Sequence, residues 1–240
     1  MTDGHVPDQA QLPIALAVAT DYEAQIVRRA LQKAVASIHP RTDFIVVQVG
    51  VGCSSLDLNY IIGSCTAIIS TGFAGALEPH IESGTLLFPE GVKKTDNSTC
   101  DVDSVLQQIA GSNWRAPVAS GYLLHTDSLL ATTDQKQRAY TYSQCVACDM
   151  ESATLATIAK QAGRPFACLR VVLDPANTTI PDPIVSLTEA QTQPSAAEFL
   201  KAVLRYPRQI PATAAFLWHT FKASRALSRS VTKLVEGCCE

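Results

Sequence analysis

The chain has 240 residues, 47% of them apolar and 17% charged, so it is long and apolar enough to bury one substantial core. Its formal charge of −3 excludes the strongly basic balance typical of nucleic-acid-binding proteins, and we expect no nucleic-acid partner. The charge is uneven, because residues 195–240 carry seven basic and three acidic side chains, a balance of +4 that leaves −7 on the rest.

The eight cysteines do not form a disulfide or zinc pattern. Cys65 and Cys168 have apolar neighbours in sequence, which is typical of thiols that pack in a core. Cys145 and Cys148 have metal or redox spacing, but no second pair or histidine cluster accompanies them. We therefore interpret them as structural thiols and expect no metal site.

The first eleven residues are polar and acidic, and we expect a disordered leader there. They lack the basic region and apolar core of a signal peptide, and no apolar run reaches the roughly 18 residues of a membrane span. Cytoplasmic localisation with reduced thiols is the expectation, with membrane association as an alternative considered below.

The apolar run Pro13–Thr20 predicts a strand buried on both faces, followed by a helix from Asp21 to about His39. Glu23 lies in the first turn of that helix, where an acid suits the helix dipole. It also lies at the carboxyl edge of a strand, where open α/β sheets bind ligands. A plain cap and a ligand-binding acid are both open interpretations at this point.

The next two predicted strands, Phe44–Val49 and Ala67–Ser70, each lead into small residues. Gly50-Val51-Gly52 follows the first strand, and the glycine-rich segment Thr71–Leu77 follows the second. Glycines at a strand end let backbone amides approach a ligand, and a tight structural turn explains them equally well.

Strand and helix patterns continue to alternate along the chain. In order, we predict a strand at Gly84–Pro89, a polar segment at Gly91–Asp103, a short helix at Val105–Ile109, a strand at Tyr122–Leu124, a helix at Thr132–Tyr140, a helix at Ala153–Ala162 and a strand at Phe166–Leu173. This alternation predicts a three-layer α/β fold. A helix of about 12 residues is roughly 18 Å long, so folding it back along a strand would bring Glu151 and Asp174 to one rim of the sheet.

After Pro175 the pattern changes. Residues 178–194 contain three prolines and predict a surface loop or linker, followed by helices at Ala196–Tyr206 and Ala212–Val235. The second helix carries an apolar stripe of Leu217, Phe221, Leu227, Val231 and Leu234, and a basic stripe of Lys222, Arg225, Arg229 and Lys233. Such a helix either packs on the domain with its basic face in water or lies on an anionic membrane surface.

Five motifs occur together: Glu23 after the first strand, Gly50-Val51-Gly52, Ser70–Leu77, Asp149-Met150-Glu151-Ser152, and Arg170–Asp174. In this order and spacing, the chain from about residue 13 to 177 resembles the purine nucleoside phosphorylase and methylthioadenosine nucleosidase superfamily. It most resembles the branch of hopanoid-associated phosphorylases, the adenosylhopane-processing nucleosidases. That likeness extends to residues 127–132, 169–176 and 205–211 and covers nearly all of the chain except the leader and the last few residues.

The resemblance implies a nucleoside phosphorylase-like α/β core at residues 12–177 with a central mixed sheet. Residues 178–240 would form a proline-containing loop and amphipathic helices packed on that core. Relatives are dimers, trimers or hexamers, and a homodimer is the expectation for this chain.

The resemblance also implies cleavage of an N-ribosidic bond. Asp174 corresponds to the acid that protonates purine N7, which requires a raised pKa, and Glu23 to the acid that activates the attacking water. Glu151 would accept hydrogen bonds from the ribose hydroxyls, and Met150 would lie against the ribose. The remaining expected substrate-binding residues are Gly52, Phe73, Ala74, Gly75, Leu129 and Asp149.

Three departures from the superfamily pattern affect the expected reaction. Phosphorylases place an arginine and a serine around phosphate, where this chain has Ser70 and Phe73, so hydrolysis is favoured. Arg28 and Arg29 lie inside the first helix, at least one turn past the rim. Leu173 replaces a serine that bonds the catalytic aspartate, which makes the site drier. Leu129 stands where an aromatic residue is expected near the purine.

We therefore expect hydrolysis of a 5′-substituted adenosine, adenosylhopane above all, to adenine and ribosylhopane, without a cofactor. The alternatives are phosphorolysis of the same substrate with inorganic phosphate, hydrolysis of methylthioadenosine, adenosylhomocysteine or futalosine, and a non-catalytic nucleoside-binding protein. The basic, apolar tail fits a hydrophobic 5′ substituent and peripheral membrane contact.

Overall fold

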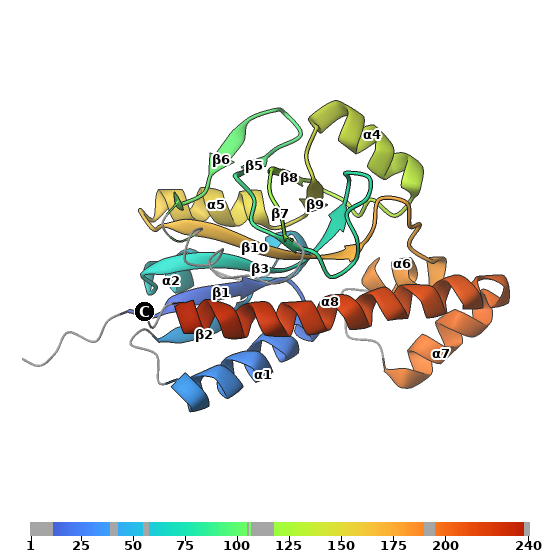
Figure 1. Ribbon diagram of the computed structural model, residues 1–240, viewed down its shortest axis with the longest axis horizontal. Helices are drawn as coiled ribbons and strands as arrows, with labels where there is room; N and C mark the ends of the chain where they lie inside the picture. Colours follow the sequence, from blue (N-terminus) through green and yellow to red (C-terminus); the bar gives the residue numbers. More distant parts are fainter. Residues whose placement is uncertain are drawn as a thin grey trace, which may run out of the picture.

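The computed structural model describes residues 12–38, 43–54, 58–104, 106, 118–189 and 195–237. This part of the chain forms a ten-stranded mixed sheet flanked by helices (Figure 1). The predicted α/β fold with a central mixed sheet and a helical C-terminal extension is confirmed. The predicted leader lies outside the described residues, as does the predicted helix Val105–Ile109 apart from Leu106.

The centre of the sheet is the long strand β3 (Ala67–Ala76). It pairs in parallel with β1 (Ile14–Val18) on one side and with β10 (Phe166–Asp174) on the other. Its last two residues then pair in antiparallel fashion with β9 (Ala147–Asp149). Strand β3 therefore connects the two parts of the sheet, and its second half lies where they meet.

The outer strands complete the sheet on both sides. Strand β2 (Phe44–Gln48) pairs with β1, and the remaining strands are β4 (Leu86–Leu87) and β7 (Val118–Ala119) beside β10, and β8 (Tyr122–His125), β5 (Gly91–Lys93) and β6 (Thr99–Asp101) beyond β9.

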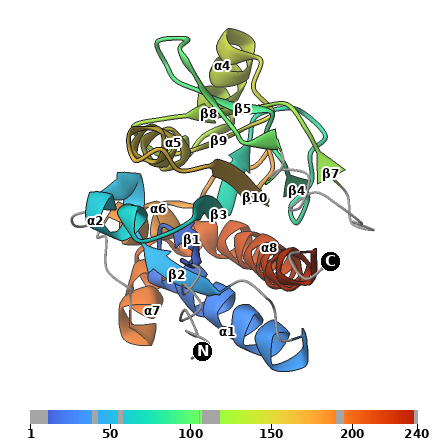
Figure 2. The same ribbon diagram turned by 90° about the vertical axis from the view of Figure 1, so that its left-hand side faces the viewer.

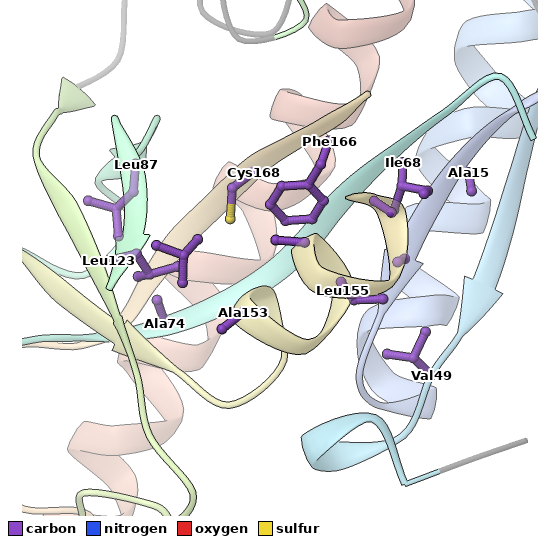
Figure 3. Close-up of a cluster of buried hydrophobic side chains, with 14 of the residues drawn as sticks. Ala15, Val49, Ile68, Ala74, Leu87, Leu123, Ala153, Leu155, Phe166 and Cys168 are labelled. Carbon is purple, nitrogen blue, oxygen red and sulfur yellow. The ribbon is translucent and has the colours of Figure 1, made fainter. Parts of the chain in front are cut away.

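Strand β1 is buried on both faces, as its continuous apolar run predicts. Successive side chains of a strand point to opposite faces, so Ala15 and Ala17 enter one core cluster while Leu16 and Val18 enter the other. The first cluster lies under α5 (Ser152–Gln161), where Leu155 packs near Ile68 (Figure 3). The second lies under α1 (Asp21–Ile38) and α8 (Ile210–Gly237), which cover the opposite face (Figure 2).

The other helices lie around this framework. They are η1 (Val51–Cys53), α2 (Leu58–Gly63), α4 (Thr133–Ser143), α6 (Asp182–Glu189), α7 (Ala196–Arg205) and η2 (Pro207–Gln209). Helix α4, predicted at Thr132–Tyr140, begins with a capping box in which Thr132 and Gln135 satisfy each other's backbone amides.

The strand predicted at Ala67–Ser70 is longer, because β3 continues through most of the glycine-rich segment Thr71–Leu77, as far as Ala76. Pairing with β10 holds it extended as far as Gly75. Glycine and alanine at a strand end signal a turn in sequence. Here they leave room for side chains that approach from neighbouring elements, as shown below.

The polar segment Gly91–Asp103, for which no element was predicted, contains the hairpin of β5 and β6. Its turn is closed by a bond from the amide of Lys94 to the carbonyl of Ser98, with Asn97 at a φ of 65°. Asparagine tolerates this left-handed conformation. Because the whole segment is polar, its sequence gives no clear sign of the hairpin. The strand predicted at Gly84–Pro89 is shorter and comprises only Leu86–Leu87.

The loop predicted at residues 178–194 is also partly wrong, because α6 occupies Asp182–Glu189. Pro183 lies in the first turn of that helix, where a proline costs no hydrogen bond. The prolines that were interpreted as signs of a loop therefore lie at the start of a helix. Residues 190–194 lie outside the described part of the chain.

The apolar stripe predicted on α8 divides into two parts. Leu227, Val231 and Leu234 are fully buried against the sheet, whereas Leu217 and Phe221 are exposed. Phe221 and Leu227 are six residues apart, a rotation of about 240°, so they lie on different faces of the helix. The prediction of a single apolar stripe along this helix was therefore wrong. The C-terminal half packs as a core helix, and the first half presents apolar side chains to solvent.

Candidate active site

Three buried acids lie around the second half of β3. Glu23 comes from the start of α1, Glu151 immediately precedes α5, and Asp174 ends β10. Each has at most 6% of its surface exposed. The sequence predicts Glu151 and Asp174 at one rim and Glu23 at the carboxyl edge of a strand. In the structure, Glu23 bonds the amide of Phe73 in β3 and Asp174 lies opposite Gly75. Glu151 is joined to the same stretch through Arg170, which contacts both Glu151 and the carbonyl of Phe73.

Glu23 is held by backbone amides on both carboxylate oxygens. Its Oε2 accepts from the amides of Ala19 at 3.1 Å and Thr20 at 2.9 Å, and its own amide donates to Thr20 Oγ1. These bonds form a capping box. Oε2 of Glu23 therefore acts as a plain helix cap. Its Oε1 accepts from the amide of Phe73 at 2.7 Å, which ties the acid to β3.

Gly72 makes this close approach feasible. A Cβ there would collide with Glu23 Oε1 and would lie 2.8 Å from Nη1 of Arg170, and the φ of Gly72 is 150°. A residue with a side chain would displace one of the two charged groups, so the glycine is explained by packing against Glu23 and Arg170.

Arg170 is a fully buried cation of the site, with 1% of its surface exposed. Its Nη2 lies 2.5 Å from Asp149 Oδ2 and donates to Ser70 Oγ at 2.8 Å and to Ser152 Oγ at 3.1 Å. Asp149 in turn accepts from the amide and the hydroxyl of Ser152 at the start of α5. The Asp149 carboxylate is thus committed to Arg170 and Ser152, and its side chain has no exposed surface.

Glu151 is held more loosely than Asp149. Its Oε1 accepts from the amide of Gly52 at 3.1 Å, and its Oε2 lies 3.4 Å from Arg170 Nη2. Burial, opposed by Arg170 and reinforced by Asp149 and Glu23, raises the pKa of Glu151 to about 7. Gly52, expected to contact substrate, donates its amide to this carboxylate.

Asp174 lies at a register shift between β10 and β3, opposite Gly75. A Cβ on Gly75 would lie 3.2 Å from Asp174 Oδ2, so this glycine gives the acid its space. Burial raises the pKa of Asp174 to about 6, although the neighbouring Lys136 ammonium opposes that rise. A carboxyl group whose pKa is raised in this way can carry a proton near neutral pH.

Sequence reasoning missed Lys136, whose Nζ lies 2.5 Å from Asp174 Oδ2. It belongs to α4, whose residues are largely polar, and lies 38 positions before its partner. No periodic or motif signal distinguishes it from the exposed residues around it. Only the docking of α4 against the end of β10 reveals the pair.

The other predicted site residues differ in burial. Ala74 is buried, and Phe73, Met150 and Leu129 are half-buried. The Phe73 ring lies 6.3 Å from that of Tyr22, next to Glu23. Leu129 lies in the loop after β8.

Ser70, one of the two residues expected where phosphorylases hold phosphate, is engaged within the protein. Ser70 bonds Arg170 and Ser152, and the Arg170 guanidinium is paired with Asp149 and Glu151. Arg28 and Arg29 are exposed on α1. Asp149, Glu151 and Glu23 all act on Arg170, so the surroundings of this arginine suit a neutral or cationic ligand better than an anion.

Cys145 and Cys148 are buried thiols without a disulfide, packed with Leu77 and Leu124. Burial raises the pKa of Cys145 and of Cys148, which keeps both neutral. Within the described ranges, no group of three histidine, cysteine or acidic side chains is arranged to hold a metal ion. Among the described helices, none has the length and hydropathy needed to cross a membrane.

Comparison with known proteins agrees with this geometry. The family described as the phosphorylase superfamily matches residues 4–206. No curated protein sequence matches the chain significantly.

Several solved structures share the fold. Futalosine hydrolase of Helicobacter pylori strain 26695 is 14% identical, with a TM-score of 0.65, over 95% of this chain and 98% of that one. The 5′-methylthioadenosine/S-adenosylhomocysteine nucleosidase of Neisseria meningitidis, in complex with methylthio-immucillin-A, is 16% identical, with a TM-score of 0.64, over 94% and 99%. The S-adenosylhomocysteine nucleosidase of Streptococcus pyogenes, with 5-methylthiotubericidin, is 18% identical, with a TM-score of 0.62, over 94% and 97%. At these identities the likeness establishes the fold.

Proposed function

This chain belongs to the phosphorylase superfamily, whose typical reaction is cleavage of a nucleoside N-ribosidic bond, and we propose that it hydrolyses a 5′-substituted adenosine. The proposed substrate is adenosylhopane, and the products are adenine and ribosylhopane. The observation that carries the proposal is the grouping of Glu23, Glu151 and Asp174, all buried, around the second half of β3.

The leaving base needs a proton, because breaking the bond leaves negative charge on the purine. Asp174 is the proposed general acid and donates to purine N7. Its pKa of about 6 suits this role, since an acid with a pKa near the working pH is both partly protonated and able to donate.

The sugar side needs negative charge and a nucleophile. Glu151, when ionised, would accept hydrogen bonds from the ribose hydroxyls and stabilise the positive charge that develops on the ring. Glu23 Oε1 accepts one hydrogen bond, from Phe73, and so keeps capacity to accept a proton from an attacking water. Met150, next to Glu151, would contact the ribose face.

Hydrolysis is preferred to phosphorolysis because the cation next to the acids is already neutralised. Arg170 contacts two carboxylates, and a phosphate placed there would meet Asp149 and Glu151 as like charges. Water carries no charge and avoids that repulsion.

A hydrophobic 5′ substituent is supported by the first part of the C-terminal extension. Six large apolar residues of α7 and α8 are between 44% and 64% exposed: Leu200, Leu204, Ile210, Leu217, Trp218 and Phe221. Helix α8 reaches the site, since Ser224 Oγ lies 3.0 Å from the hydroxyl of Tyr22, the neighbour of Glu23. An apolar chain leaving the ribose could be covered by these side chains, and the same residues could contact a membrane surface.

The test is adenine release from adenosylhopane in detergent, with and without phosphate, for wild type and Asp174→Asn. We expect release without phosphate, and a loss of about 100-fold or more in kcat/KM for the variant. Release that requires phosphate would show phosphorolysis instead. Absence of adenine from adenosylhopane and from every 5′-thioadenosine would refute the proposal.

The role of the apolar residues is tested separately with Trp218→Gln and Phe221→Gln. Both should raise KM for adenosylhopane and leave methylthioadenosine cleavage unchanged, because only the long apolar group would reach α8. Leu12→Gln is the matched control, since Leu12 is 41% exposed at the opposite end of β1. Equal effects on both substrates would contradict this assignment.

A further inference from the structure

Lys136 is a buried lysine whose ammonium has all three donors engaged. It has no exposed surface, and its Nζ donates to the carbonyls of Pro175 at 3.0 Å and Thr178 at 2.7 Å while it contacts Asp174 Oδ2. The lysine therefore fixes both the carboxyl group at the end of β10 and the loop that follows it.

Burying an ammonium group is costly unless it is paired and hydrogen-bonded. Here the two carbonyls supply hydrogen bonds, and Asp174 supplies the opposite charge. Elsewhere on α4, Arg138 and Asp134 form an ordinary ion pair in which both side chains are largely exposed. A surface pair of that kind needs no special environment, whereas Lys136 requires one.

We propose that Lys136 is the positioning residue of the general acid: it holds Oδ2 of Asp174, so that Oδ1 carries the proton, and its charge sets the pH range in which that proton is present. This inference rests on the proposed function for the role of Asp174, and it concerns a lysine to which no motif assigns a role.

The groups around the pair make Lys136 the main charge acting on Asp174. From β9, the neutral thiol of Cys148 lies near the acid, and from α8, His219 lies within electrostatic range of Lys136. Burial raises the pKa of Asp174, and Lys136 lowers it, which gives the value of about 6. Without the ammonium, only a backbone hydrogen bond at Asp174 still opposes the effect of burial, so the pKa of Asp174 must rise.

The sign of the expected change follows directly. The reaction needs protonated Asp174, so kcat/KM falls as pH rises through the pKa of this acid. In Lys136→Met, the alkaline limb of the profile should move to higher pH. The acid is also weaker, so the maximal rate should fall by about 10-fold.

The experiment measures adenine release against pH for wild type, Lys136→Met and the control Lys160→Met, whose lysine is exposed on α5. Lys136→Arg, which keeps the positive charge, should retain the wild-type limb if it folds. In an Asp174→Asn background, Lys136→Met should cause no further loss. An unchanged alkaline limb in Lys136→Met, or an additive loss in the double variant, would overturn the inference.

A direct titration separates this inference from the proposed function. The carboxyl carbon of Asp174 can be followed by NMR in wild type and Lys136→Met, without any substrate, after assignment with Asp174→Asn. A higher pKa in the variant supports the inference even if no adenine is released from adenosylhopane. An equal pKa in both proteins refutes it. If Lys136→Met does not fold, Lys136→Gln provides the same comparison with a polar side chain, judged by the same two outcomes.

Discussion

Arg170 and Lys136 are both fully buried cations beside the candidate active site, but they neutralise different carboxyl groups. Arg170 contacts Asp149 at 2.5 Å. The side chain of Asp149 has no exposed surface and also accepts a hydrogen bond from Ser152. Lys136 contacts Asp174 at 2.5 Å, the proposed general acid. The first pair connects β10 to the start of α5, and the second connects α4 to the end of β10.

The two cations differ in how many carboxyl groups each of them neutralises. Around Arg170, two carboxylates share one guanidinium, so Glu151, at 3.4 Å, keeps a pKa raised to about 7. Around Lys136, one ammonium faces one acid, and burial still raises the pKa of Asp174 to about 6. Cation position thus decides which acid is committed to structure and which one can exchange a proton.

The largest effect is expected from removing the arginine. Arg170→Met leaves Asp149 and Glu151 buried without a countercharge, which should lower the free energy of unfolding by about 3–5 kcal/mol. Urea denaturation measures this loss. Arg138→Met is the control, because Arg138 is 80% exposed and forms an i,i+4 pair worth about 0.3–0.5 kcal/mol. Similar losses in the two variants would show that the Arg170 cluster is not structural.

The next comparison uses the two glycines of β3. Gly72→Ala drives a methyl group into Glu23 and Arg170, and we expect a loss of about 1–3 kcal/mol in stability. Gly75→Ala, at 3.2 Å from Asp174 Oδ2, needs only a small shift and should cost less stability while lowering kcat. Gly63→Ala is the control, since nothing lies within 4 Å of a Cβ there. Thermal unfolding measures the stability loss and adenine release measures kcat. A larger stability loss in Gly75→Ala than in Gly72→Ala would contradict this assignment.

The smallest effect is the shape of the wild-type pH profile. Ionised Glu151 and protonated Asp174 are both required. Because the pKa of Glu151, about 7, lies above that of Asp174, about 6, kcat/KM should rise with pH up to about 6 and fall again above about 7. The product is a bell with its maximum between these values, where each group is in its active form for about a quarter of the molecules. A flat profile from pH 5 to 8 would show that the two acids do not act in these states.

Much of this fold could be predicted because its signals are local. Continuous apolar runs identified β1 and β10 as buried strands, and Glu23, shortly after β1, was located at the sheet edge. The errors also have local causes. The glycines after Ser70 led to a predicted strand that ends too early, and the prolines near α6 led to a predicted loop. Glycine also occurs inside strands, and proline also occurs in the first turn of a helix.

The sequence by itself determined which acids stand at the ends of strands, since strand period and helix length fix where the chain meets the rim. Only the tertiary structure decided which cation faces which acid. Lys136 and Asp174 are 38 residues apart, and Arg170 reaches Asp149 across the start of α5. Charge pairing in a core depends on how helices dock, and a polar helix carries no sequence pattern that reveals which of its lysines will be buried.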